Sequence, residues 1–384
     1  MTNNPELALL EETEAMTRTT ASAAIATDEV LAPGQPNAGV RPPLRIAPRL
    51  RQKLQQGDKA SVMSLLQDAI ELEHSTIPPY LYALYSLDES KNSQIVDIIE
   101  SVVVEEMLHM TLACNILNAL GGTPVLDKPD FIPHYPGTLP GIEPPDPTWQ
   151  VNLEPFSKDM VQKIFMQIEL PEFGPIVKFA AASTDDEPTT IGQFYSQLEE
   201  QIAALDEGAF VSPPRNQVGP DIMPESIVVH DVPSMRKAIK TIIDQGEGTD
   251  TDPFDENGDP AHYYRFAETV KGRELTRTPP YKYEGKEVPL DPTGIFNVQP
   301  DRQGSGQSQA ACTFNYTYTC LLKTLHAFFN GENNKDQFRA ALGLMMSLKQ
   351  QAKDMMSNLN VGPSFEYQPT LSEKPDSQSP GQAS

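Results

Sequence analysis

The chain has 384 residues, enough for one large domain or two ordinary ones, and its 39% hydrophobic content can supply a substantial core. It carries 53 acidic and 29 basic side chains, a formal net charge of −24, which argues against nucleic acid and anionic membranes as partners. The three cysteines are odd in number and form no C-x-x-C pair, which argues against a disulfide framework and favours a reducing compartment. Since the first residues lack the features of a signal peptide and no apolar run approaches about 18 residues, we expect a cytoplasmic protein that does not span a membrane.

The two ends of the chain have compositions that differ from the middle. Residues 1–45 are rich in Thr, Ala, Pro and Gly with weak periodicity, which predicts a flexible N-terminal arm. Residues 369–384 are polar and predict a disordered tail. The folded domain is therefore expected over residues 46–368.

The first core helix is predicted over residues 59–87, where apolar residues recur at helical spacing. At about 100° per residue, Glu73 lies at the centre of the apolar stripe, whereas Glu71 points about 160° away toward solvent. Pro78 and Pro79 follow about one turn later, and two prolines remove backbone donors and predict a kink. This kink either opens space for a substrate or only shapes the bundle.

The second core helix is predicted over residues 92–120, with Asn92 or Ser93 as its cap and a Gly-Gly pair at its end. Glu106 lies at the centre of its apolar stripe, and His109, three residues later, shares that face. A lone buried carboxylate is costly without a partner. The pair is therefore either a buried hydrogen bond or an E-x-x-H half of a metal site, as found in carboxylate-bridged four-helix bundles.

The next stretch, residues 121–156, is rich in Pro and Gly and predicts a long crossover to a third helix that begins at Ser157. Glu169 lies at the edge of the apolar stripe of this helix. A further helix is predicted over residues 190–205, and Glu199 flanks its stripe at about 80°. Either carboxylate is a candidate to face the core.

The C-terminal half contains further predicted helices and one predicted hairpin. A helix that begins near Val232 is ended by glycines, and another contains His262, with Asp259 on the same side three residues earlier. The segment KYEGKEVPL is strand-like. Two more helices end the domain, and the last has a predicted core face of Phe338, Leu342, Met345 and Met346.

Five segments together resemble the ferritin-like domain of the iminophenyl-pyruvate dimer synthase family, which includes a violacein-pathway enzyme. They are ELEHSTIPPYLYALYSL, VEEMLHMTLACNILNALGG, IELPE, QGEGT and VGPSFE, and the resemblance extends over about residues 54–365. It implies an all-α fold, a ferritin-like four-helix bundle with a long crossover, extra C-terminal helices and long loops.

The resemblance also bears on the site. It favours Glu169 over Glu199, because the family carries an I-E-x-P-E element there. It leads us to expect E-x-x-H where this chain has D-x-x-H at Asp259, and Asp255 and Glu256 are upstream alternatives for that carboxylate.

The predicted metal ligands are four carboxylates and two imidazoles from four helices: Glu73, Glu106, His109, Glu169, Asp259 and His262. Such a set balances the charge of two divalent cations. Oxygen and nitrogen ligands without thiolate suit iron, with manganese as the second candidate.

We therefore expect an iron-dependent, di-iron enzyme of specialised metabolism that acts on a small organic substrate, either oxidatively with dioxygen or as a Lewis acid. The resemblance implies coupling of two imine molecules derived from an aromatic amino acid. An iron-storage protein is disfavoured by the arm, the crossover and the tail. Because Asp259 departs from the E-x-x-H pattern of the family, the alternative is a non-enzymatic metal-binding or scaffold protein with a degenerate site. Assembly into a homo-oligomer is compatible with the sequence.

Overall fold

The computed structural model describes residues 44–371, apart from 145, 172–189, 207, 250–251 and 305. The predicted arm lies outside the described residues except for its last two positions, and the predicted tail does so except for 369–371. Within the described residues, the only sheet is an antiparallel pair of short strands, β1 (Arg45–Ile46) and β2 (Ile142–Glu143). The prediction of an all-α fold is confirmed.

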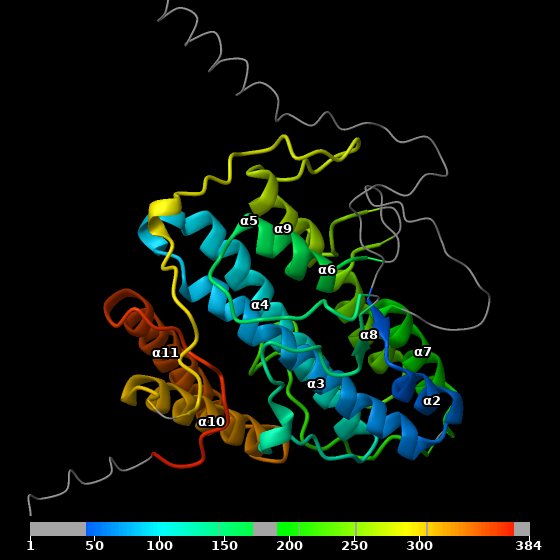
Figure 1. The fold of residues 1–384 in the computed structure, drawn as a ribbon. Helices are drawn as coiled ribbons and strands as arrows, with labels where there is room; N and C mark the ends of the chain where they lie inside the picture. The colour runs from blue at the N-terminus through cyan, green and yellow to red at the C-terminus, as the bar shows by residue number, and fades with distance from the viewer. Residues whose placement is uncertain are drawn as a thin grey trace, which may run out of the picture. The chain divides into compact units, whose positions relative to one another are not determined.

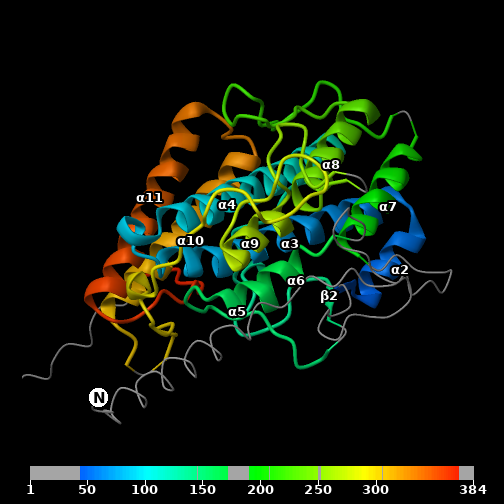
Figure 2. The same cartoon turned by 90° about the horizontal axis from the view of Figure 1, so that it is seen from above.

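The other described elements are helical (Figures 1 and 2). In chain order they are α2 (Pro48–Gln56), α3 (Lys59–Tyr85), α4 (Glu89–Ala119), the 3-10 helix η1 (Pro129–Phe131), α5 (Lys158–Met160), the π-helix η2 (Val161–Phe165), α6 (Met166–Ile168), α7 (Ile191–Ala203), α8 (Val232–Gly246), α9 (His262–Lys271), the 3-10 helix η3 (Pro292–Gly294), α10 (Gln309–Phe329) and α11 (Lys335–Asn358). None of these helices combines the length and the apolar character that a membrane span requires.

Helices α3 and α4 lie side by side as the central pair (Figure 1). Helix α7 packs against α3, while α8 and α9 pack against α4. The continuous helical segment α5–η2–α6 packs against α9, and α10 and α11 form a second pair that joins the first through α11 and α3. This arrangement surrounds the middle of α3 and α4 with other helices and makes it the interior of the domain.

Asp58 caps the start of helix α3, since its side chain accepts a hydrogen bond from the backbone N–H of Ser61, and the helix continues through both prolines. Pro79 has no N–H to donate to the carbonyl of Ser75, four residues earlier. The hydroxyl of Tyr135, which lies in the crossover, donates to that carbonyl at 2.7 Å. The proline pair therefore gives the crossover a point of attachment on α3.

Replacement of Tyr135 with phenylalanine is expected to lower the free energy of unfolding by about 1–3 kcal/mol, because the buried Ser75 carbonyl would lose its donor while the ring is kept. Urea denaturation followed by circular dichroism measures the change. Tyr281→Phe is the matched control, since the Tyr281 hydroxyl makes only a 3.3 Å bond at the surface. An equal loss of stability in both variants would contradict the attachment.

The start of α4 differs from the prediction. The helix begins after Asp88, whose side chain caps Ser90, and the backbone leaves the helical conformation at Asn92 (φ −127°, ψ 33°). The Asn92 side chain does not cap a helix. Instead it exchanges hydrogen bonds with the backbone of Asp291 and Gly294 at η3. The predicted cap is therefore a kink, because this buried amide binds a distant turn.

The predicted third helix is present, but its middle is the π-helical turn η2. A π-turn winds more slowly than an α-helix and shifts the angular position of every later residue. Phe165 in this turn packs against Tyr80 and Phe266, with ring centroids 4.5 and 5.1 Å apart. Glu169 follows directly after α6 and is buried.

Two predictions for the C-terminal half are correct only in part. In the last helix, Phe338 and Met345 of the predicted core face are partly buried against the core, but Leu342 is 43% and Met346 69% exposed. Leu348 and Ala352 are buried instead. The side of α11 that meets α10 decides which residues are covered, and the apolar pattern of α11 alone does not specify that side. The strand-like segment turns back on residues 272–276 through several backbone hydrogen bonds and one antiparallel bridge, between Arg273 and Glu287, but it forms no regular strand.

Candidate metal centre

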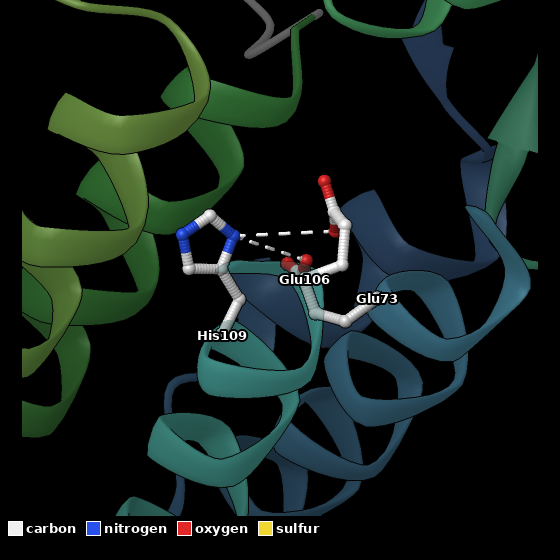
Figure 3. Close-up of side chains that lie close together, drawn as sticks. All are labelled: Glu73, Glu106 and His109. Carbon is white, nitrogen blue, oxygen red and sulfur yellow. Dashed lines mark ion pairs between the residues drawn. The ribbon is translucent and has the colours of Figure 1, made fainter. Parts of the chain in front are cut away.

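Five buried side chains from α3, α4, the end of α6 and the start of α9 converge in the interior of the bundle: Glu73, Glu106, His109, Glu169 and His262. They form two overlapping groups, one of Glu73, Glu106 and His109 and the other of Glu106, Glu169 and His262. In each group, one potential ligand atom per residue lies within 4.8 Å of the others. Figure 3 shows the first group, in which both carboxylates point toward the same nitrogen of the His109 ring. Glu106 is common to both groups.

Each histidine presents Nδ1 to the carboxylates. His109 Nδ1 lies 3.6 Å from Glu73 Oε2 and 4.0 Å from Glu106 Oε2. His262 Nδ1 lies 2.9 Å from Glu106 Oε1 and 3.4 Å from Glu169 Oε2. The two imidazole rings are stacked with centroids 5.3 Å apart. The geometry therefore places Glu106 between two equivalent sets of one glutamate and one histidine.

The outward nitrogen of each imidazole has an acceptor of its own. His109 Nε2 lies 3.0 Å from Gln245 Oε1, and His262 Nε2 lies 3.0 Å from Glu105 Oε2. An acceptor at Nε2 requires the proton there and leaves the lone pair on Nδ1, the form in which histidine binds metal. The buried His262 Nδ1 makes no hydrogen bond of good geometry, although Glu106 lies close to it.

Two tyrosines bind the same carboxylates from the other side. The Tyr80 hydroxyl donates to Glu169, and the Tyr195 hydroxyl donates to Glu73. Burial, together with the nearby carboxylates, raises the pKa of both phenols well above the usual value, so both remain protonated donors. Sequence reasoning missed both residues. The available signal was a tyrosine on the apolar stripe of a helix, where the hydroxyl needs a buried partner.

The buried groups of the cluster shift one another's pKa values. Burial raises the pKa of Glu106 to about 8, and the negative charge of Glu169 adds to this rise. Burial alone would lower the pKa of His109 and His262, but hydrogen bonds and charges from the adjacent glutamates raise both. Without cations, the cluster therefore retains protons that cations in the same space would replace.

The structure does not bring Asp259 to the cluster. Helix α9 begins at His262, after Ala261 in an extended conformation, so Asp259 precedes the helix and is exposed. Its backbone N–H donates to Asp255 Oδ1 at 2.9 Å, within a surface turn. The D-x-x-H pattern places two side chains on one face only where a helix runs through both residues, and here it starts too late.

The alternative carboxylates also lie outside the cluster. Glu199 forms an ion pair with Arg236 at 3.1 Å, and Glu256 forms one with Lys240 at 2.9 Å, both at the surface. The Asp255 side chain accepts hydrogen bonds from backbone N–H groups of its own turn. Among the described residues, the centre thus has three inward carboxylates where the sequence predicted four.

His74, which follows Glu73 in α3, does not belong to the cluster and contacts Tyr318 and Phe131 instead. Its Nε2 lies 2.7 Å from the Tyr318 hydroxyl, and its ring lies 4.4 Å from that of Phe131. Burial lowers its pKa to about 3, so it remains neutral. His74 therefore helps to pack α10 and η1 onto α3.

A cavity opens beside the cluster, between α3, α6, α7 and α8. Its walls are largely apolar and include Leu72, Ile168, Ile191, Ile242 and Ile243. At its edge, Glu247 accepts a hydrogen bond from Gly192 N at 2.9 Å. A Cβ at Gly192 would lie 2.6 Å from Glu247 Oε2, so a larger residue there would displace this carboxylate. The described residues that line the cavity include no lysine or arginine.

Fold and site together define a helical bundle with a buried carboxylate–histidine centre. A family profile described as ferritin-like matches residues 66–271, which is more than half of the chain and includes all five clustered side chains. The chain belongs to this ferritin-like family.

One solved structure supports the same fold. The crystal structure of a ferritin-like protein from Caulobacter vibrioides is similar, with a TM-score of 0.55 and 24% sequence identity, over 85% of this chain and 100% of that chain. No protein with a curated description matches the chain at a significant level. The narrower resemblance to the iminophenyl-pyruvate dimer synthase family stays a prediction.

Proposed function

We propose that the protein binds two iron ions at this cluster and uses them to oxidise a small organic substrate. The observation that carries the proposal is the convergence of five buried ligand side chains, with both Nδ1 atoms turned inward. His262 Nδ1 is a buried ligand atom without a hydrogen bond, which a cation would satisfy. Three carboxylates and two imidazoles without thiolate suit iron, with manganese second.

The residues divide naturally between two ions. Glu73 and His109 would hold one, Glu169 and His262 the other, and Glu106 would bridge them. When bound in such a site, reduced iron supplies electrons for the activation of dioxygen. Tyr80 and Tyr195 each donate to one oxygen of a glutamate and so leave the other oxygen for a metal. The surrounding helices exclude bulk water from this space.

The cavity supports a small substrate with an apolar part. Its isoleucine and leucine walls favour apolar groups, and its described lining contains no lysine or arginine to pair with an anionic group. The family resemblance extends the proposal to an imine derived from an amino acid, whose apolar side chain would contact these walls. A carboxylate on such a substrate would need the metal ions as its countercharge.

Two measurements test this proposal. Elemental analysis after anaerobic loading with iron(II) should give about two iron ions per chain. The loaded protein should then consume dioxygen faster when imines of aromatic amino acids are generated in the same solution. Absence of bound iron would reject the metal centre. Bound iron without any acceleration by these imines would favour the alternative of a non-enzymatic metal-binding protein.

Glu73 and Glu71 provide a test on a single helix. Glu73 is buried in the cluster, whereas Glu71 is half-buried and lies beside Gln67 at 3.3 Å. Glu73→Ala is expected to lower the iron content from about two ions to about one, because it removes a ligand of only one position. Glu71→Ala, the matched control, should leave the content unchanged. The reverse ranking would refute the assignment of the inner face of α3.

A further inference from the structure

The two metal positions of the proposed centre have the same kinds of inner ligand but different outer partners. Each has one glutamate of its own, one histidine bound through Nδ1, and a share of Glu106. The acceptor at Nε2 is the carboxylate of Glu105 for His262 and the neutral amide of Gln245 for His109. We infer that the position at His262 binds metal more tightly and fills first. This inference rests on the proposed metal centre.

The partner of His262 carries a full negative charge. Glu105 accepts from Arg265 Nη2 at 2.8 Å through the carboxylate oxygen that does not contact the imidazole. Arg265 also donates to Ser101 Oγ at 3.0 Å, which holds its guanidinium against α4. Because arginine stays protonated, Glu105 stays ionised beside it. A carboxylate bound to the N–H of a ligand histidine increases the electron density on the nitrogen that binds metal.

The partner of His109 is neutral, and its orientation follows from its other contact. Gln245 Nε2 donates to Glu225 Oε2 at 3.1 Å, and an ionised carboxylate can only accept. The amide oxygen of Gln245 must therefore face His109. Asn257 Nδ2 donates to the same oxygen of Glu225, also at 3.1 Å. The backbone of Glu225 has φ 64°, a conformation that residues other than glycine rarely adopt.

The outer partners therefore favour the same tautomer at both histidines. The carboxylate of Glu105 binds His262 directly, whereas the carboxylate of Glu225 reaches His109 only through Gln245. Outer partners of metal-bound histidines typically change metal affinity about 10- to 100-fold. Repulsion between two ions also separates two binding steps. The test must consequently change the outer partners while the five inner ligands stay the same.

Anaerobic calorimetric titration with iron(II) measures both steps. Glu105→Gln keeps an acceptor at His262 but removes its charge, and it should weaken the tight step about 10- to 100-fold while the weak step stays near wild type. The double change Gln245→Glu with Glu225→Gln moves the charge one residue inward at constant net charge. It should tighten the weak step. Glu225→Gln alone should leave the tight step near wild type, because Glu225 contacts the partner of His109 and not that of His262.

Two further measurements assign the steps to positions. His262→Ala should remove the tight step, and His109→Ala should remove the weak one. In the metal-free protein, ¹⁵N chemical shifts of the imidazoles should show Nε2 of both residues protonated at every pH, and Nδ1 protonated as well wherever the imidazole is charged, a readout independent of catalysis.

The outcomes separate the inference from the proposed function. Failure of the wild-type protein to bind iron would overturn both. Two binding steps with a tight step that survives Glu105→Gln unchanged, or that is lost in His109→Ala, would overturn the inference alone. Circular dichroism of each variant shows that its helices are intact.

Discussion

Replacement of Glu106 with alanine is expected to abolish binding of both metal ions. Glu106 is the one residue that belongs to both ligand groups, so its loss leaves each position with a single glutamate and a single histidine. Two protein ligands from different helices rarely suffice to hold a divalent ion in place. Elemental analysis after anaerobic iron(II) loading should fall from about two ions per chain to near zero.

Asp259→Ala is the matched control, because the sequence pattern proposed this residue as a ligand and the structure places it at the surface. It should retain the full iron content. Loss of iron in this variant would show that its turn moves into the site when metal binds. Full iron content in Glu106→Ala would remove the basis of the proposed centre.

The second large effect is a metal-dependent stability that grows with pH. Burial raises the pKa of Glu106 to about 8 from its usual 4.5, and the adjacent carboxylates raise the pKa of His109 and His262 above 6.5. At these three groups, the folded, metal-free protein thus holds protons more strongly than the unfolded chain does. The stability that these groups contribute is complete below their unfolded pKa values and is lost as the pH rises through the folded values.

Cations replace these protons, so metal should stabilise the protein most at high pH, at which these groups hold their protons weakly. At pH 8, saturation with manganese(II), which air does not oxidise readily, should raise the unfolding temperature by about 10 °C, and at pH 5 the rise should be small. Differential scanning fluorimetry measures both values. Glu106→Ala should show no rise at either pH. A rise as large at pH 5 as at pH 8 would contradict the proton–metal competition.

The sequence by itself determined which faces of α3 and α4 are buried. In α3 and α4, helical spacing placed Glu73 and Glu106 at the centre of apolar stripes, and the structure buries both. His109 followed from the spacing of one helical turn. These predictions succeed because the side-chain positions along one regular helix depend only on local geometry.

Irregular local geometry reduced that accuracy. Glu169 lay only at the edge of its predicted stripe, because the sequence pattern gave no sign of the π-turn before it. Asp259 was expected on the face of His262, but α9 begins three residues later than that expectation requires. In both places the predicted periodicity assumed a continuous α-helix, and the backbone departs from one.

Only the tertiary structure decided what surrounds the ligands. Glu105 lies next to Glu106 in the sequence and binds His262, which is 157 residues away. Gln245 and the two site tyrosines likewise reach their partners from other helices. A helical pattern shows that a side chain points inward, but the packing of distant segments determines which groups it meets. The charge, the tautomer and the cation affinity of this centre therefore depend on contacts that no local pattern encodes.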